Sequence, residues 1–120
     1  MPLPSSAGRV QFRIRILRGD AVAIGPGKVA LLVAIAETGS LSEAARRLGM
    51  SYRRAWLLVD EMNQALRAPA VSAAAGGARG GGTVLTPVGE KILKHYAAME
   101  AAACKATVRD AAALRRLLAP

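Results

Sequence analysis

The side chains that could carry acid–base or nucleophilic chemistry are few in this chain and do not gather into a known constellation. It has one histidine, His95, and one cysteine, Cys104. Together with Glu100 on the same predicted helix, they form neither a nucleophile–base pair nor a metal-binding set. No Ser/His/Asp arrangement is visible elsewhere in the sequence. We therefore expect no catalytic residue, no metal and no cofactor, and we expect that the protein is not an enzyme.

Cationic side chains, which pair with phosphates and base edges, are abundant. The chain has 17 Lys and Arg against 8 Asp and Glu, a formal net charge of +9 and a pI near 11.1. This surplus favours a polyanionic partner, although it does not separate DNA from RNA or from an anionic membrane surface. The membrane alternative is disfavoured, because it needs a basic amphipathic helix with bulky anchors and the last helix is rich in alanine.

Five polar or aromatic residues at the start of one predicted helix have the chemistry to read duplex DNA. Arg53 or Arg54 could pair bidentately with guanine O6 and N7 in the major groove. Ser51 and the helix N-terminus could hold a phosphate, and Tyr52 could bond a phosphate or touch a thymine methyl group. Trp56 leaves two alternatives open, a contact with DNA or a core position against the first helix.

The elements that would position these side chains have the pattern of a helix-turn-helix. Helices are predicted over about 27–38, 41–48 and 51–67, capped by Ser40 or Ser42 and by Ser51. Ala45 supplies the small residue needed where two helices cross, and Gly49 suits the tight turn that follows. The alternative is an ordinary helical hairpin within another fold. The apolar faces expected to pack are Val29, Leu32, Val33, Ile35 and Ala36 of the first helix, and Ala44, Leu48, Ala55, Leu58, Val59 and Met62 of the next two.

Strands are predicted on both sides of these helices. The alternation of Val10, Phe12, Ile14 and Ile16 with polar residues predicts a half-buried N-terminal strand. Residues around 71 and 83–85 flank a glycine-rich loop and predict a two-stranded wing. Arg79 in this loop either reaches the minor groove or a phosphate, or keeps a mobile loop soluble. The loop lacks the phosphate-binding G-x-x-x-x-G-K-[ST] motif.

A long helix is predicted from Pro87, with Thr86 as its N-cap and a break near residues 104–107. It extends past a small winged core, so its apolar stripe needs a partner, most simply the same helix of a second copy. The alternative is that the helix folds back on its own core. The stripe consists of Val88, Ile92, Tyr96 and Met99.

These elements predict a mainly α fold, a winged helix-turn-helix with an N-terminal strand, a two-stranded wing and a long C-terminal dimerisation helix. We divide the chain into a flexible leader (1–9), a DNA-binding domain (10–86) and a helical dimerisation extension (87–120). The longest apolar run, residues 29–36, is far too short to span a membrane, and the N-terminus does not read as a secretory signal. A cytoplasmic location is expected.

Residues 24–99 resemble the N-terminal DNA-binding domain of ModE-type molybdate-responsive regulators, a winged helix distantly similar to the LysR type. The matching pieces are Ser51-Tyr52-x-x-Ala55-Trp56, Asp60-Glu61-Met62-Asn63, the glycine-rich wing 76–82 and Thr86-Pro87-Val88-Gly89-Glu90. The resemblance implies a homodimer that binds double-stranded DNA as a repressor or activator.

Regulators of this family carry C-terminal molybdate-binding domains, whereas this sequence ends at Pro120. We therefore expect a stand-alone DNA-binding member without an evident small-molecule ligand. Two alternative functions remain open from the sequence. One is non-specific, nucleoid-associated DNA binding, and the other is a helix-turn-helix module that contacts other proteins.

Overall fold

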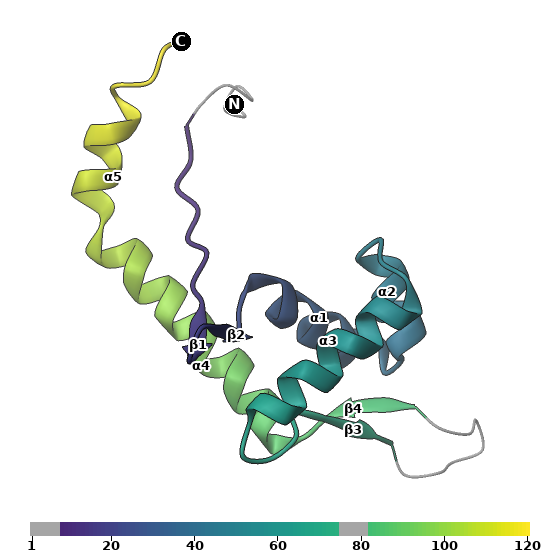
Figure 1. The fold of residues 1–120 in the computed structure, drawn as a ribbon. Helices are drawn as coiled ribbons and strands as arrows, with labels where there is room; N and C mark the ends of the chain where they lie inside the picture. The colour runs from purple at the N-terminus through teal and green to yellow at the C-terminus, as the bar shows by residue number, and fades with distance from the viewer. Residues whose placement is uncertain (1–7, 75–81) are drawn as a thin grey trace.

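The computed structural model describes residues 8–74 and 82–120, in which two small strand pairs flank a three-helix body and a helical arm follows (Figure 1). Residues 1–7 of the predicted leader and Arg79 of the predicted wing lie outside this range. The elements in chain order are β1 (Ile16–Arg18), β2 (Ala21–Ile24), α1 (Pro26–Thr38), α2 (Leu41–Arg47), α3 (Tyr52–Ala65), β3 (Val71–Ala73), β4 (Thr83–Leu85), α4 (Pro87–Ala106) and α5 (Val108–Arg115). The fold is a mainly α winged helix-turn-helix, as the sequence predicts.

The helix boundaries follow from local capping signals. The hydroxyl oxygens of Ser40, Ser51 and Thr86 each accept a hydrogen bond from a backbone N–H in the first turn of the helix that follows. Gly39 and Gly49 adopt φ of 67° and 68°, a left-handed conformation that other residues rarely adopt. These caps and turns confirm the predicted ends of α1 and α2 and the predicted start of α3.

The core lies between the three helices and the wing, and α1 contributes most of it. Leu31, Leu32 and Ile35 are fully buried, and Ala34 is nearly so. The prediction for Val33 was wrong, because it is 41% exposed, and Ala36 is exposed as well. Helix α1 packs against α2, α3, α4 and β4. Its buried face is therefore wide, and it is centred on other residues than the apolar stripe expected from the sequence. The other buried residues of this core are Leu41, Ala44, Ala45, Ala55, Met62, Ala70 and Val71.

The predicted strand over residues 10–16 is wrong in extent. Strand pairing begins only at Ile16, where β1 and β2 form an antiparallel hairpin around Gly19. Residues 8–15 form no strand and run alongside α4 and α5 (Figure 1). Val10 and Phe12 line grooves there with Tyr96 of α4 and Leu114 of α5. The alternation is therefore satisfied by packing against helices, since one apolar edge can face a helix as well as a sheet.

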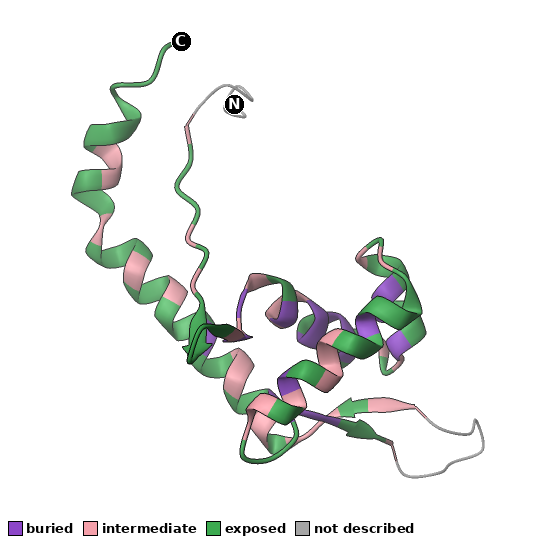
Figure 2. Ribbon diagram, viewed as in Figure 1, coloured by how far each residue is buried: buried purple, intermediate pink, exposed green. Residues whose placement is uncertain are grey.

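The wing and the last two helices match the sequence prediction more closely. Strands β3 and β4 pair antiparallel, with Val71 opposite Leu85 and Ala73 opposite Thr83. The N–H of Thr83 also donates to Gly39 O at 3.0 Å, which fixes the wing to the turn between α1 and α2. The C-terminal helix is interrupted at Thr107, within the predicted break. Figure 2 shows that buried residues concentrate in the body, whereas α5 has none.

Candidate nucleic-acid interface

The predicted DNA-reading residues lie together on the exposed N-terminal part of α3. Ser51, Tyr52, Arg53 and Arg54 are all exposed, and Tyr52 retains 56% of its surface. Trp56 is 50% exposed, so its side chain is not the core position that the sequence left open. On the opposite side of the helix, the small side chain of Ala55 and the long one of Met62 are fully buried. This arrangement anchors α3 by one face and leaves its cationic and aromatic face to solvent.

The guanidinium groups of α3 differ from those of α2 in their partners. Arg46 pairs with Glu43 at 3.3 Å, and Arg47 pairs with Glu37 at 2.6 Å. Among the ion pairs of residues 8–74 and 82–120, none involves Arg53 or Arg54. Their donors therefore remain available for phosphate or base acceptors, which an Arg fork can bind through two parallel hydrogen bonds.

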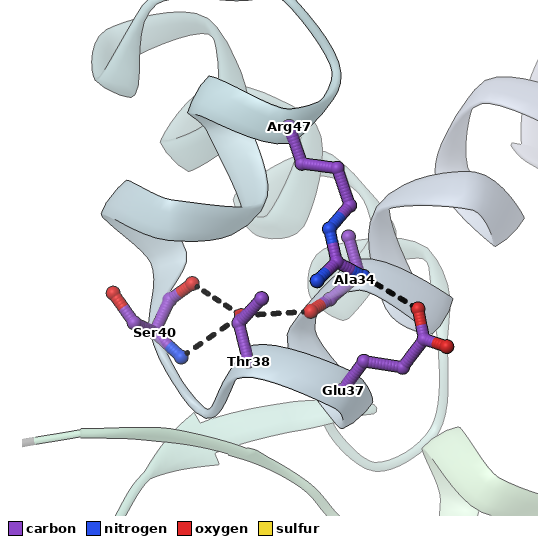
Figure 3. A network of polar contacts seen from close by, with 5 residues as sticks. All are labelled: Ala34, Glu37, Thr38, Ser40 and Arg47. Carbon is purple, nitrogen blue, oxygen red and sulfur yellow. Dashed lines mark hydrogen bonds and ion pairs between the residues drawn. The ribbon is translucent and has the colours of Figure 1, made fainter.

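The crossing of α1 and α2 is held by a polar network at the turn between them (Figure 3). Thr38 Oγ1 lies 2.7 Å from Ala34 O and 3.0 Å from Ser40 O, and accepts from Ser40 N–H at 3.3 Å. The Arg47–Glu37 pair joins the two helices on the exposed side. Because α2 packs on α3, this network helps to orient the helix that carries the exposed arginines.

Two polar side chains away from the exposed face of α3, one on α1 and one on α3, have roles that the sequence did not reveal. Lys28 of α1 is only 9% exposed, and its ammonium group donates to Val22 O at 2.5 Å and lies 3.6 Å from Glu61 Oε2. It therefore ties β2 to α1 and α3. Asn63 of α3 bonds to the backbone at the start of the wing. Nothing in the local sequence indicates that Lys28, in the first turn of α1, is buried. Asn63 could have been noticed, because it belongs to a segment that resembles ModE-type regulators.

The comparisons with known proteins agree with this geometry. Residues 27–90 match the family described as bacterial regulatory helix-turn-helix protein, lysR family. The chain belongs to this family. It is 51% identical over 90 residues to the molybdenum-pterin-binding protein MopB of Rhodobacter capsulatus, covering 75% of this chain and 33% of MopB. It is 42% identical over 71 residues to the DNA-binding transcriptional dual regulator ModE of Escherichia coli K12, covering 59% of this chain and 27% of ModE.

These matches confirm the predicted resemblance to ModE-type regulators within the LysR-type family. The chain spans about a third of the length of the curated relatives it matches, as with MopB at 33% and the Azotobacter vinelandii protein ModE at 35%. Among solved structures, the Corynebacterium glutamicum OxyR C206 mutant is similar with a TM-score of 0.50 and 21% identity. That likeness covers 70% of this chain and 25% of OxyR, and it supports the winged fold alone.

The match to the lysR family ends in the first turn of α4, and the apolar stripe of α4 lies largely beyond it. Val88 and Ile92 pack partly against the core, whereas Met99 is 45% exposed. Tyr96 is only 5% exposed, and its hydroxyl group donates to Ile14 O at 2.9 Å. All four line one apolar groove of about 300 Å³. The stripe is therefore a shallow groove that its own N-terminal segment partly covers, rather than a fully free face.

The largest exposed apolar side chains near the C-terminus lie on or beside α5. Leu117 is 80% exposed, and Leu114 is 65% exposed. Val108 and Leu118 are exposed to a similar degree. Apolar groups at this density on a short helix favour contact with another surface. The dimerisation residues predicted from the sequence lie on α4, and the leucines of the C-terminal end add exposed apolar surface beyond them.

Two further searches concern other kinds of site. Within the described ranges 8–74 and 82–120, no three His, Cys, Asp or Glu side chains lie close enough together to hold a metal ion. None of the helices in the part of the chain that the structure describes is long and apolar enough to cross a membrane.

Proposed function

We propose that this LysR-family chain is a sequence-specific, ModE-like transcriptional regulator that binds double-stranded DNA as a homodimer and performs no catalysis. The observation that supports this best is the exposed face of α3 on a winged helix-turn-helix. There Tyr52 and Trp56 flank two arginines that form no ion pair within residues 8–74 and 82–120. The names of its relatives, which include the transcriptional regulator ModE, support the same function. A cytoplasmic location follows from this function.

The proposed readout follows from the geometry of α3. The N-terminal part of a recognition helix enters the major groove, so Arg53 or Arg54 can donate two hydrogen bonds to one guanine. The oxygen of Ser51 already accepts from Arg54 N–H at 3.1 Å, so its hydroxyl hydrogen remains free to donate to a phosphate. Tyr52 and Trp56 supply apolar surface beside these polar groups.

The dimer is proposed from the apolar surface near the C-terminus. Met99, Leu114, Leu117 and Leu118 are all at least 45% exposed. In a twofold dimer that binds DNA, the two α3 helices must lie on successive turns of one DNA face, about 34–36 Å apart. The preferred site would then be an inverted repeat.

A second candidate function is non-specific, nucleoid-associated binding, which the net charge of +9 favours. Phosphate contacts dominate the affinity in both cases, so salt dependence does not distinguish them. Selection of bound duplexes from a random library at near-physiological salt does. We expect enrichment of an inverted repeat. Binding without enrichment would establish the nucleoid-associated function instead, and no binding at all would refute both.

The same assay tests the role of Arg53. We expect Arg53→Ala to lower affinity for the selected repeat by about 10-fold to 100-fold, the range of one good bidentate contact. Binding to unrelated duplexes should change much less. Arg18→Ala is the matched control, because Arg18 is an exposed arginine on β1, outside both the exposed N-terminal face of α3 and the proposed dimer surface on α5. An equal loss on every sequence would assign Arg53 to the phosphate backbone.

A further inference from the structure

The amide side chain of Asn63 joins the recognition helix to the wing. Its Oδ1 accepts from Ala70 N–H at 2.9 Å and from Val71 N–H at 3.4 Å, and its Nδ2 donates to Val71 O at 3.1 Å. Ala70 is fully buried and Val71 is 6% exposed. Three of the hydrogen bonds available to one carboxamide are therefore spent on two consecutive backbone units where β3 begins. Buried backbone groups such as these need a partner, and Asn63 provides it.

The first turn of α4 contacts the same stretch of backbone from the other side. Thr86 N–H donates to Ala70 O at 2.9 Å, and Thr86 Oγ1 donates to Pro69 O at 2.6 Å. Gly89 is buried directly against Ala70, where an added Cβ would overlap Ala70 O and lie 3.2 Å from the Leu85 Cβ. Only a glycine allows α4 to pack this closely.

We propose that Asn63 is a positioning residue that sets the orientation of the wing relative to α3, and that α4 is coupled to both through the same contacts. We call this set the wing junction and define it as Asn63, residues 69–71, Thr86 and Gly89. Its consequence for DNA reading rests on the proposed function. A change in the direction of α4, as on pairing with a second copy, then reorients the wing without altering the base contacts of α3.

The wing junction gives a structural role to two segments that lie outside the proposed DNA interface. The sequence around Asn63 and the sequence from Thr86 to Gly89 both resemble ModE-type regulators, yet neither carries an exposed DNA-reading side chain. They meet at the wing junction from opposite sides. Hydrogen bonds from α3 and a close backbone approach from α4 hold the same stretch of chain, so the start of the wing is linked to both helices.

The first test is Asn63→Asp, which keeps the shape and both acceptor bonds but places an oxygen against Val71 O. Amide hydrogen exchange should become at least about tenfold faster in β3, β4 and the first turn of α4, and stay unchanged in α1 and α2. Gln64→Glu is the matched control, because it makes the same chemical change one residue along, where the amide bonds only to Asp60 at an exposed site. The control should leave all these rates unchanged.

Gly89→Ala tests the junction from the side of α4 and does not depend on how Asn63→Asp folds. It should accelerate exchange at the same amides, and the double variant should be no worse than the more severe single one. A uniform rise over the whole chain would show a merely structural role and overturn the proposal, as would unchanged β3 and β4. Both readouts are taken without DNA, so they decide the junction even if the wild-type chain binds no duplex.

With DNA, the two variants should share one further signature. Protection of the selected repeat in hydroxyl-radical footprints should weaken at the flanks, where the wing lies, and persist at the positions read by α3. Affinity should fall by about tenfold. Loss of protection at flanks and centre alike would contradict a role limited to wing orientation.

Discussion

Trp56 is the single tryptophan of the chain and lies half exposed beside the arginines of α3. A ring in this position contributes little to the core, so its substitution should separate binding from stability. We expect duplex DNA containing the selected repeat to change the intrinsic fluorescence of the wild-type chain. Trp56→Phe should lower affinity by about fivefold, or about 1 kcal/mol. Its free energy of unfolding should change by less than about 0.5 kcal/mol.

The opposite outcome for Trp56→Phe would contradict this prediction. A large loss of stability with unchanged affinity would mean that the ring packs on the protein rather than on DNA. Because Trp56→Phe removes the only tryptophan, affinity is compared by the anisotropy of a labelled duplex, and stability by urea unfolding followed by circular dichroism.

Tyr96 makes the other residue-scale contact that can be tested alone. Burial raises the pKa of its phenol above the ordinary value, and the Glu100 carboxylate adds to this, while the charge of Arg13 opposes it. The folded state therefore favours the neutral phenol. The resulting stability is complete below the unfolded pKa of about 10 and is lost as the pH rises through the raised folded pKa.

Tyr96→Phe should make this pH dependence smaller. At neutral pH it should lose about 1 kcal/mol of unfolding free energy, because the hydrogen bond to Ile14 O disappears. Above pH about 10, the gap between wild type and variant should narrow, since only the wild type has this phenol to ionise. Urea unfolding from pH 7 to 11 measures both quantities. A gap that widens with pH would contradict the direction of the pKa shift.

At the scale of elements, the turn between α2 and α3 depends on the backbone of Gly49. Its φ of 68° is strained for any other residue, although an added Cβ would meet no atom within 4 Å. Gly49→Ala should therefore cost about 1–2 kcal/mol through the backbone alone. Gly27→Ala in α1 also points into open space but lacks a positive φ, so it should stabilise by about 0.4–1 kcal/mol. Opposite shifts of the denaturation midpoint would confirm the pair, and a loss of the same size in both would not.

The sequence predicts those elements whose ends depend on local chemistry. Three helices begin at hydroxyl caps, Ser40, Ser51 and Thr86, each directly before a helical pattern. The glycines that follow α1 and α2, Gly39 and Gly49, adopt a backbone conformation that ends a helix. These signals need no knowledge of the rest of the chain. The same holds for the chemistry of α3, since residue type and helical spacing already separate its apolar face from its cationic one.

The features that the sequence failed to predict are those that depend on which other element packs against a segment. The alternation at residues 10–16 describes one apolar edge, and nothing local says whether a strand or a helix receives it. Val33 was misplaced for the same reason, because periodicity gives the direction of a stripe but not how many neighbours surround the helix. The wing junction lies further out of reach, since it joins Asn63 to Ala70 and Gly89 only after the wing has folded.

At the scale of the whole molecule, the chain separates into a buried body and an exposed helical end (Figures 1 and 2). The body needs no partner to complete its core. By contrast, among residues 8–74 and 82–120 the cover of α5 lies along one side, where Gly8 and Phe12 approach Leu118. The apolar surface that remains on α5 therefore gives the most direct test of assembly.

We expect the wild-type chain to sediment as a dimer and the double variant Leu114→Gln/Leu118→Gln to shift towards monomer. Both leucines are more than half exposed, so their replacement removes apolar surface from an interface rather than from the core. Circular dichroism and the melting temperature should change little. Val33→Thr is the control, because it reduces exposed apolar surface on α1 and should leave the dimer intact.

The DNA-binding consequence of this change follows from twofold symmetry. A dimer binds an inverted repeat through two α3 helices held at a fixed spacing, whereas a monomer binds each half-site separately. The α5 variant should therefore lose affinity for the full repeat and keep affinity for a single half-site, because its α3 is untouched. Equal losses of affinity for the full repeat and for the half-site would mean that α5 supports the fold of the winged helix-turn-helix. A wild-type chain that sediments as a monomer would contradict the proposed homodimer.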